Sequence, residues 1–204
     1  MTTPNGFDHF RQQFLGIADA TFTFRADLHR RLREIDRKAL NAQVLVKRRG
    51  KELMGYGVVA QSFREGAQQL QAASALVQQA IEPLMMGFMR TLRDTQQVDK
   101  LEGLPPAVRK LAPRLCEALQ KHQRALEEGA VQTQRDIRQL QQALLRFESI
   151  VAEIEYVVVN GRIEAALKGS AQAMLAQVSA EMDKAVVQVR DLLRAYREHV
   201  DRMF

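Results

Sequence analysis

Apolar residues recur at alternating steps of three and four through most of the chain. This spacing is typical of helices in left-handed coiled-coil packing. Three shorter series run along residues 28–46, 56–84 and 175–203. The longest series begins near residue 112, and its apolar members are Cys116, Leu119, Leu126, Ala130, Ile137, Leu140, Leu144, Phe147, Val151, Ile154, Val158, Gly161 and Ala165. Four long helices with one apolar seam each predict an all-α fold, an elongated antiparallel four-helix bundle with coiled-coil packing.

Glycines mark the expected reversals of the chain. Gly50, Gly55 and Gly57 bracket a first turn near residues 50–55, and Gly169 with Ser170 marks a second turn near residues 169–171. Glycine allows the backbone angles that end one helix and begin another. The sequence therefore predicts one domain over residues 1–204, with a first helical hairpin at 7–95, a connector at 96–113 and a second hairpin at 114–204.

Prolines add detail to the connector and to the second helix. Pro106 suits the first turn of the third helix, whereas Pro113 is expected to kink it. Pro83 is expected to bend or break the second helix. In the resulting up-down-up-down topology, both hairpin tips lie at one end, and the connector and both termini lie at the other.

Composition is consistent with a water-exposed helical protein. The chain has 204 residues, of which 46% are hydrophobic and 26% charged. Its longest apolar stretch, residues 81–92, contains Glu82, Pro83 and Arg90 and is shorter than the ~20 residues that a membrane span needs. The N-terminus has no signal-peptide pattern, so a cytoplasmic location is expected. Cys116, the single cysteine, lies on an apolar seam and is expected to be a buried thiol.

Positive charge is concentrated near the first turn. The net charge is +6, and residues 30–51 contain nine basic residues but only two acidic ones, Glu34 and Asp36. The basic residues are Arg30, Arg31, Arg33, Arg37, Lys38, Lys47, Arg48, Arg49 and Lys51. Such a patch attracts nucleic acid or an acidic membrane, but no aromatic residues are interleaved for base stacking. This favours a solvated helix face with a few arginines that contact a protein partner.

No motif in the chain indicates catalysis. His9, His29, His122 and His199 are scattered, and none has the spacing to a second ligand that a metal-binding helix uses. No glycine-rich loop is followed by the Lys-Ser or Lys-Thr of a phosphate-binding loop. The sequence predicts a protein that is not an enzyme and that binds no metal or cofactor.

The two predicted turns lie in an internal repeat. The segments that start at Asn41 and Asn160 align without a gap at a constant separation of 119 residues. Gly50 then corresponds to Gly169, and Val59 to Val178. Such repetition indicates a fold that uses one structural unit twice.

Both segments resemble the signalling hairpin of bacterial methyl-accepting chemotaxis receptors, which reads approximately NAA(I/V)EAARAGExGRGFAVVAxE(I/V)R. The similarity covers some 25 to 30 residues of each copy. In the first copy the matching residues are Asn41, Ala42, Val44, Arg48, Gly50, Gly55, Tyr56, Val58, Val59, Ala60 and Arg64. In the second they are Asn160, Ile163, Glu164, Ala165, Ala166, Gly169, Ala176, Val178 and Glu181.

The resemblance implies a protein-interaction module for chemosensory signal transduction. In the receptors, hairpins of two subunits form one four-helix bundle, whereas this chain resembles a single-chain, asymmetric version of it. The implied partners are a chemotaxis-type histidine kinase, its adaptor protein or receptor tips. The implied partner-binding residues are Asn41, Val44, Arg48, Val58, Arg64, Asn160, Ile163, Glu164 and Glu181, and the tip turns are Gly50, Gly55 and Gly169.

The two copies depart from the family pattern in complementary ways. Where the receptors have Glu followed three residues later by Arg, the first copy has Leu45 and Arg48, and the second has Glu164 and Leu167. One face of the bundle is therefore expected to be basic and the other more acidic. The hypothesis is that these faces bind different partners.

Two other functions stay open at this point. A response-regulator phosphatase also uses a long helical hairpin, and it would need an acid and an amide one turn apart on an exposed face; Asp136 with Gln132 or Gln139 is the nearest candidate. The other alternative is a basic coiled coil that binds nucleic acid or a membrane surface through residues 30–51. Neither the oligomeric state nor self-association is determined by the sequence.

Overall fold

The computed structural model describes residues 6–167 and 172–203, and every regular element in these ranges is a helix. The elements are α1 (Gly6–Arg49), the short 3-10 helix η1 (Gly50–Leu53), α2 (Met54–Glu102), α3 (Pro106–Leu111), α4 (Pro113–Ala166) and α5 (Gln172–Met203). The prediction of an all-α fold is confirmed for the described residues. At 1.5 Å per residue, α4 alone, with 54 residues, is about 80 Å long.

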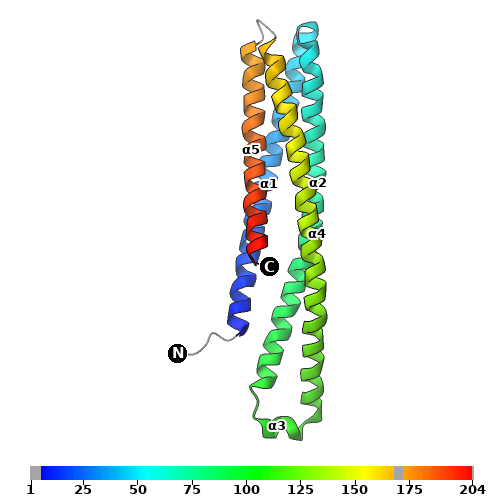
Figure 1. Cartoon of the computed structure of the whole chain (residues 1–204), viewed down its shortest axis with the longest axis vertical. Coiled ribbons are helices and arrows are strands. Elements are labelled where there is room, and N and C mark those ends of the chain that lie inside the picture. The colour runs from blue at the N-terminus through cyan, green and yellow to red at the C-terminus, as the bar shows by residue number, and fades with distance from the viewer. Residues whose placement is uncertain (1–5, 168–171, 204) are drawn as a thin grey trace.

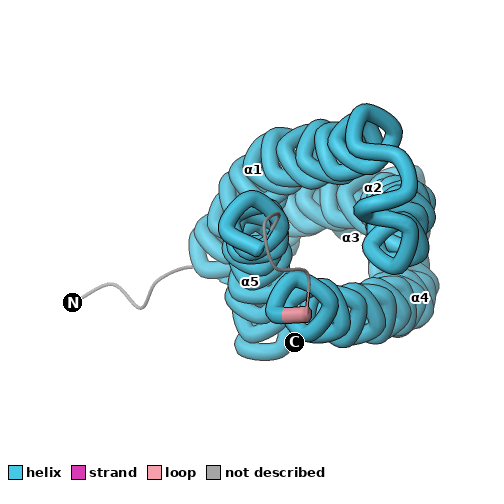
Figure 2. The backbone as a smooth tube through the Cα atoms, turned by 90° about the horizontal axis from the view of Figure 1, so that it is seen from above, coloured by secondary structure: helices cyan, strands magenta, loops and turns pink. Residues whose placement is uncertain are grey.

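The four long helices form a closed ring of neighbours. The packed pairs are α1 with α2, α2 with α4, α4 with α5, and α5 with α1. Neighbouring helices in this ring run in opposite directions (Figure 1). Seen from above, the helices surround a common axis (Figure 2). The apolar seams of all four helices therefore face one shared interior.

Helix ends follow the predicted breakers. Gly50 has a φ of 57°, a left-handed conformation that favours glycine, and α1 ends just before it. Three basic residues in the last turn of α1, Lys47, Arg48 and Arg49, complement the negative end of the helix dipole. Ala112 is extended, with φ −125° and ψ 86°, because the following Pro113 disfavours a helical conformation there.

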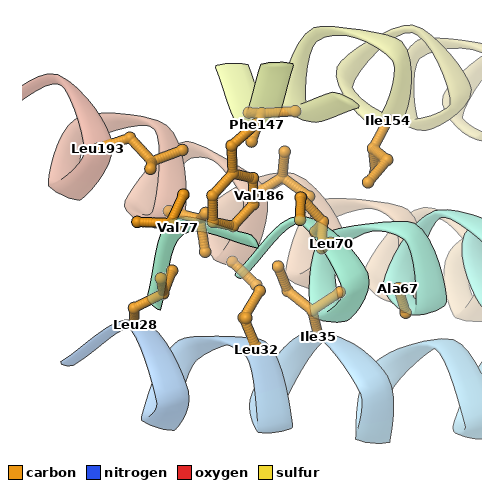
Figure 3. Close-up of a cluster of buried hydrophobic side chains, with 14 of the residues drawn as sticks. Leu28, Leu32, Ile35, Ala67, Leu70, Val77, Phe147, Ile154, Val186 and Leu193 are labelled. Carbon is orange, nitrogen blue, oxygen red and sulfur yellow. The ribbon is translucent and has the colours of Figure 1, made fainter. Parts of the chain in front are cut away.

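Residues on the predicted seams form the core. In α2 every predicted seam position from Tyr56 to Leu84 is buried, and in α4 the same holds from Ile137 to Ala165. Side chains from all four helices meet in this interior, as Leu28, Leu70, Phe147 and Val186 show (Figure 3). In α5 the series of steps along residues 175–203 includes Val178, Leu192 and His199, which are expected to be buried but are only partly buried. The adjacent Ser179, Leu193 and Val200 are buried instead.

Towards α3, the helices α2 and α4 continue beyond the end of α5 and then beyond that of α1 (Figure 1). We call residues 89–102 and 113–135 of these two helices the two-helix extension. The prediction of a buried seam is wrong here. Cys116 and Ala130 are exposed, and Leu119 and Leu126 are half-buried. A seam is buried only where neighbouring helices cover it, and α5 ends before this part of the molecule (Figure 1).

The predictions about the connector, Pro113 and the termini are also corrected. Helix α2 continues to Glu102, inside the predicted connector at 96–113, and the short helix α3 begins at Pro106. Pro113 begins α4 and does not kink a longer helix. Pro83 lies within α2, which continues through this position, so the helix does not break there; the expected bend stays a prediction. The outer ends of α1 and α5 lie partway along the molecule, short of α3 (Figure 1).

Candidate interaction surface

The first turn presents several of the predicted partner-binding residues to solvent. Asn41, Val44 and Arg48 are exposed on the last three turns of α1. On α2, beyond this chain reversal, the Val58 side chain is 71% exposed, and Gly55 at the start of the helix is half-buried. These side chains are available for contact with another molecule.

Arg64 is engaged within the first hairpin. Its guanidinium forms an ion pair with the carboxylate of Asp36, which joins α2 to α1. Both side chains are about one-third exposed. Arg64 therefore holds the two helices together at the surface, and a partner has to compete with Asp36 for it.

The helix ends that flank the predicted second turn lie at the same end of the molecule as the first turn. Gly169 itself is outside the described residues, but α4 ends and α5 starts at this end (Figure 1). On α4, Ile163 is exposed, and Asn160 and Glu164 are half-buried. The structure thus brings residues from both repeat copies to one end.

Glu181 connects the two hairpins through an ion pair. Its carboxylate lies 3.3 Å from Nζ of Lys38 on α1, and Nε2 of Gln177 donates to it over 3.1 Å. The hydrogen bond from Gln177, followed by the interaction with Lys38, lowers the pKa of Glu181 below its ordinary value. The side chain is exposed and charged near neutral pH, but it already has partners within the molecule.

A buried hydroxyl pair lies beneath the turns. Tyr56 on α2 and Ser179 on α5 are both fully buried, and their oxygens are 2.9 Å apart. Burial raises the pKa of the Tyr56 hydroxyl, and the hydrogen bond with Ser179 opposes that change. Because the pair joins helices from different hairpins, it fixes how the two hairpins register against each other.

One feature of this end was missed from the sequence. Along α4, four large apolar side chains are between 49% and 72% exposed and lie on one face of the helix: Tyr156, Val159, Ile163 and Leu167. We call this set the apolar face of α4. The sequence signal was present, because these positions follow the same steps of three and four as the buried seam. One helix cannot turn two such series to the interior, so one of them had to face solvent.

The positions that correspond to this set, 119 residues earlier on α1, are Arg37, Leu40, Val44 and Arg48, and all four are exposed. We call them the basic face of α1. Equivalent surfaces of the two repeat copies therefore carry different chemistry. The central pair is apolar in both copies, and the outer pair is cationic in the first copy only.

The acid that was proposed for a phosphatase, Asp136, is not exposed as that activity would require. Asp136 is 3% exposed, and its carboxylate accepts a 2.8 Å hydrogen bond from Gln132 on the preceding turn of the same helix. Among the described residues, no group of three or more His, Cys, Asp or Glu side chains could hold a metal ion. No described helix has the length and apolarity for a membrane crossing.

Comparison with known proteins gives no relative. No protein-family model matches the chain, and neither the curated proteins nor the solved structures contain a match. The resemblance to chemoreceptor hairpins therefore depends on the residues of the two repeat copies themselves.

Proposed function

We propose that this chain is a non-enzymatic protein-interaction module that acts in chemosensory signal transduction. Its scaffold in this proposal is an elongated antiparallel four-helix bundle of two hairpins with coiled-coil packing. Its partners are a chemotaxis-type histidine kinase, its adaptor protein or receptor tips. The binding surface is the end that carries both turns.

One observation carries the proposal: the two repeat copies meet at one end of a long helical rod and expose different side chains there. Arg48, Val44 and Val58 are exposed around the first turn, and Ile163 around the second. Exposed apolar side chains with charged neighbours are typical of protein-binding surfaces. The buried pair of Tyr56 and Ser179 below them supports a rigid base for this surface.

A charge-reversal experiment tests the proposal. The full chain, with Arg48→Glu or Glu164→Arg, is used to capture purified kinase, adaptor and receptor tips in separate binding assays. We expect each variant to lose a different partner, because Arg48 and Glu164 lie on different copies. Arg124→Glu, an exposed charge in the two-helix extension, is the matched control and leaves binding unchanged. If none of the three partner classes binds the unmodified chain, the proposal is wrong.

A further inference from the structure

The apolar face of α4 has no neighbour among the described residues that covers it. Its four side chains are 68%, 49%, 55% and 72% exposed in chain order from Tyr156 to Leu167. A contiguous exposed apolar strip on a charged helical protein is a feature of binding surfaces. Its steps of three, four and four residues are those of a helix-packing seam, so a second helix is the geometry that fits it.

Charged residues beside this face point to a basic occupant. Glu153 and Glu164 flank it, and neither forms an ion pair with another described residue. Two other charges nearby are already paired within the molecule, Glu155 with Arg190 and Arg162 with Asp183. Among the described residues, the uncompensated charge along the face is therefore negative.

The basic face of α1 has the matching properties. It has the same spacing, since it occupies the corresponding positions of the repeat, and it places Leu40 and Val44 between Arg37 and Arg48. Leu40 is 47% and Val44 38% exposed. Placed along the face of α4, its apolar centre can pack on Val159 and Ile163 while the two arginines approach the glutamates.

We propose that the basic face of α1 in one copy of this chain binds the apolar face of α4 in a second copy. Two α1 faces would place arginines against arginines, and like charges repel. Two α4 faces would likewise bring Glu153 and Glu164 of each copy together. Pairing of an α1 face with an α4 face avoids both repulsions and is therefore favoured. This proposal does not depend on whether a kinase or adaptor binds the same end.

Such a contact is heterologous, because each copy uses one face as donor and a different face as acceptor. Heterologous contacts extend into open chains or close into rings. A single helix-to-helix contact buries less than a standard interface, so the affinity is expected in the micromolar range. Charge complementarity makes the association weaker at high salt.

Mixing two variants of the full chain tests this pairing. Variant A, Val159→Glu with Ile163→Glu, has a damaged α4 face, and variant B, Arg37→Glu with Arg48→Glu, has a damaged α1 face. All four residues are exposed, so both variants should keep their helices, which circular dichroism checks. Mass is measured by light scattering and sedimentation over about 5–500 µM protein, at low and high salt.

The unmodified chain should grow in mass with concentration, and each variant alone should remain a monomer. An equal mixture of A and B should form a dimer that grows no further, because one intact face of each kind remains. Leu76→Glu, which replaces a 40% exposed apolar residue on α2, is the control and should associate like the unmodified chain.

Three results would overturn the proposal. The first is an unmodified chain that stays monomeric over the whole range. The second is dimerisation of variant B by itself, which would indicate pairing of two α4 faces. The third is a mixture of A and B that remains monomeric while the unmodified chain associates. If variant A loses helicity, Tyr156→Lys with Leu167→Lys replaces it in the same mixture.

Discussion

Corresponding positions of the two repeat copies can be compared inside and outside the molecule. Inside, they match, and these pairs are buried in both copies: Leu28 and Phe147, Ile35 and Ile154, Ala42 and Gly161. Outside, Arg37 and Arg48 of the first copy correspond to Tyr156 and Leu167 of the second, and all are exposed. Side chains in the interior are limited by packing against the neighbouring helices. The outer faces have no such limit, so their side chains can differ without disturbing the core.

Two pairs of corresponding core positions differ in polarity between the two copies. Tyr56 and Ser179 form a hydroxyl pair across the core, whereas their counterparts, Leu175 and Ala60, are buried and apolar. A pair that exists in only one of two equivalent places distinguishes the hairpins from each other. A buried polar pair of this kind can fix the register of packed helices.

The largest expected effect concerns the core, to which both repeat copies contribute. Ile35→Ala and Ile154→Ala, at corresponding buried positions, should each lower the free energy of unfolding by about 2–5 kcal/mol. Each change removes apolar contacts and leaves a cavity (Figure 3 shows both side chains in the core). Urea unfolding followed by circular dichroism measures both. A loss below about 1 kcal/mol for one of them would show that the two copies do not share one core.

How far the sequence could predict this fold depends on the number of neighbours that each helix has. Steps of three and four residues identified the buried faces of α2 and α4 where four helices pack, as at Phe63 and Phe147, but were shifted by one residue at three positions of α5. The same steps failed at Cys116 and Leu119, because periodicity does not tell where the neighbouring helices end. That end is set by the lengths of α1 and α5, and no residue near Cys116 carries that information.

The candidate site was predictable in its first turn and not in its ion pairs. Gly50 identified the first turn through the conformation that it allows. The pairing of Lys38 with Glu181 depends on which hairpin faces which, a tertiary property that local spacing does not determine. The apolar face of α4 was visible as a second periodic series, and it faces solvent because the other series, from Ile137 to Ala165, faces inward as predicted.

The next largest effect concerns the hydroxyl pair of Tyr56 and Ser179, which has no equivalent at the corresponding positions of the repeat. Tyr56→Phe should cost about 1–3 kcal/mol, because it leaves the fully buried hydroxyl of Ser179 without its partner. The double variant Tyr56→Phe with Ser179→Ala should be more stable than Tyr56→Phe alone, since it resembles the apolar pair Leu175 and Ala60. Unfolding in urea measures both, and a double variant that is less stable than the single one would contradict the account.

A smaller effect tests how closely α2 and α4 approach. A Cβ atom at Gly66 would lie 2.6 Å from Cγ1 of Ile154, which is too close. Gly66→Ala should lose about 1–3 kcal/mol to overpacking and regain about 1 kcal/mol from the helix propensity of alanine. The net change in unfolding free energy is a loss of about 1 kcal/mol.

Gly129 in the two-helix extension provides the matched control. A Cβ there meets nothing closer than Oγ1 of Thr91 at 3.6 Å, an ordinary contact distance. Gly129→Ala should therefore gain about 1 kcal/mol from helix propensity alone. Opposite signs at Gly66 and Gly129 are the expected result. A gain at both positions would show that the helices separate at Gly66 without cost.

The smallest expected effect concerns Lys38 and Glu181, an ion pair without a counterpart, because the corresponding positions hold Val157 and Ser62. Glu181→Gln should cost less than about 1 kcal/mol at pH 7, since the pair is at the surface and screened by water. The folded pKa of Glu181 lies below its ordinary value of about 4.5, so folding favours the charged form. The stabilisation is therefore present above that ordinary value and is lost as the pH falls through the lowered pKa. The free energy of unfolding of the unmodified chain and of Glu181→Gln is measured from pH 7 to pH 3, with Glu117→Gln as the exposed control. The difference from the unmodified chain should shrink as the pH falls for Glu181→Gln alone. A difference that stays constant with pH would mean that the shape of the side chain, and not its charge, makes this contact.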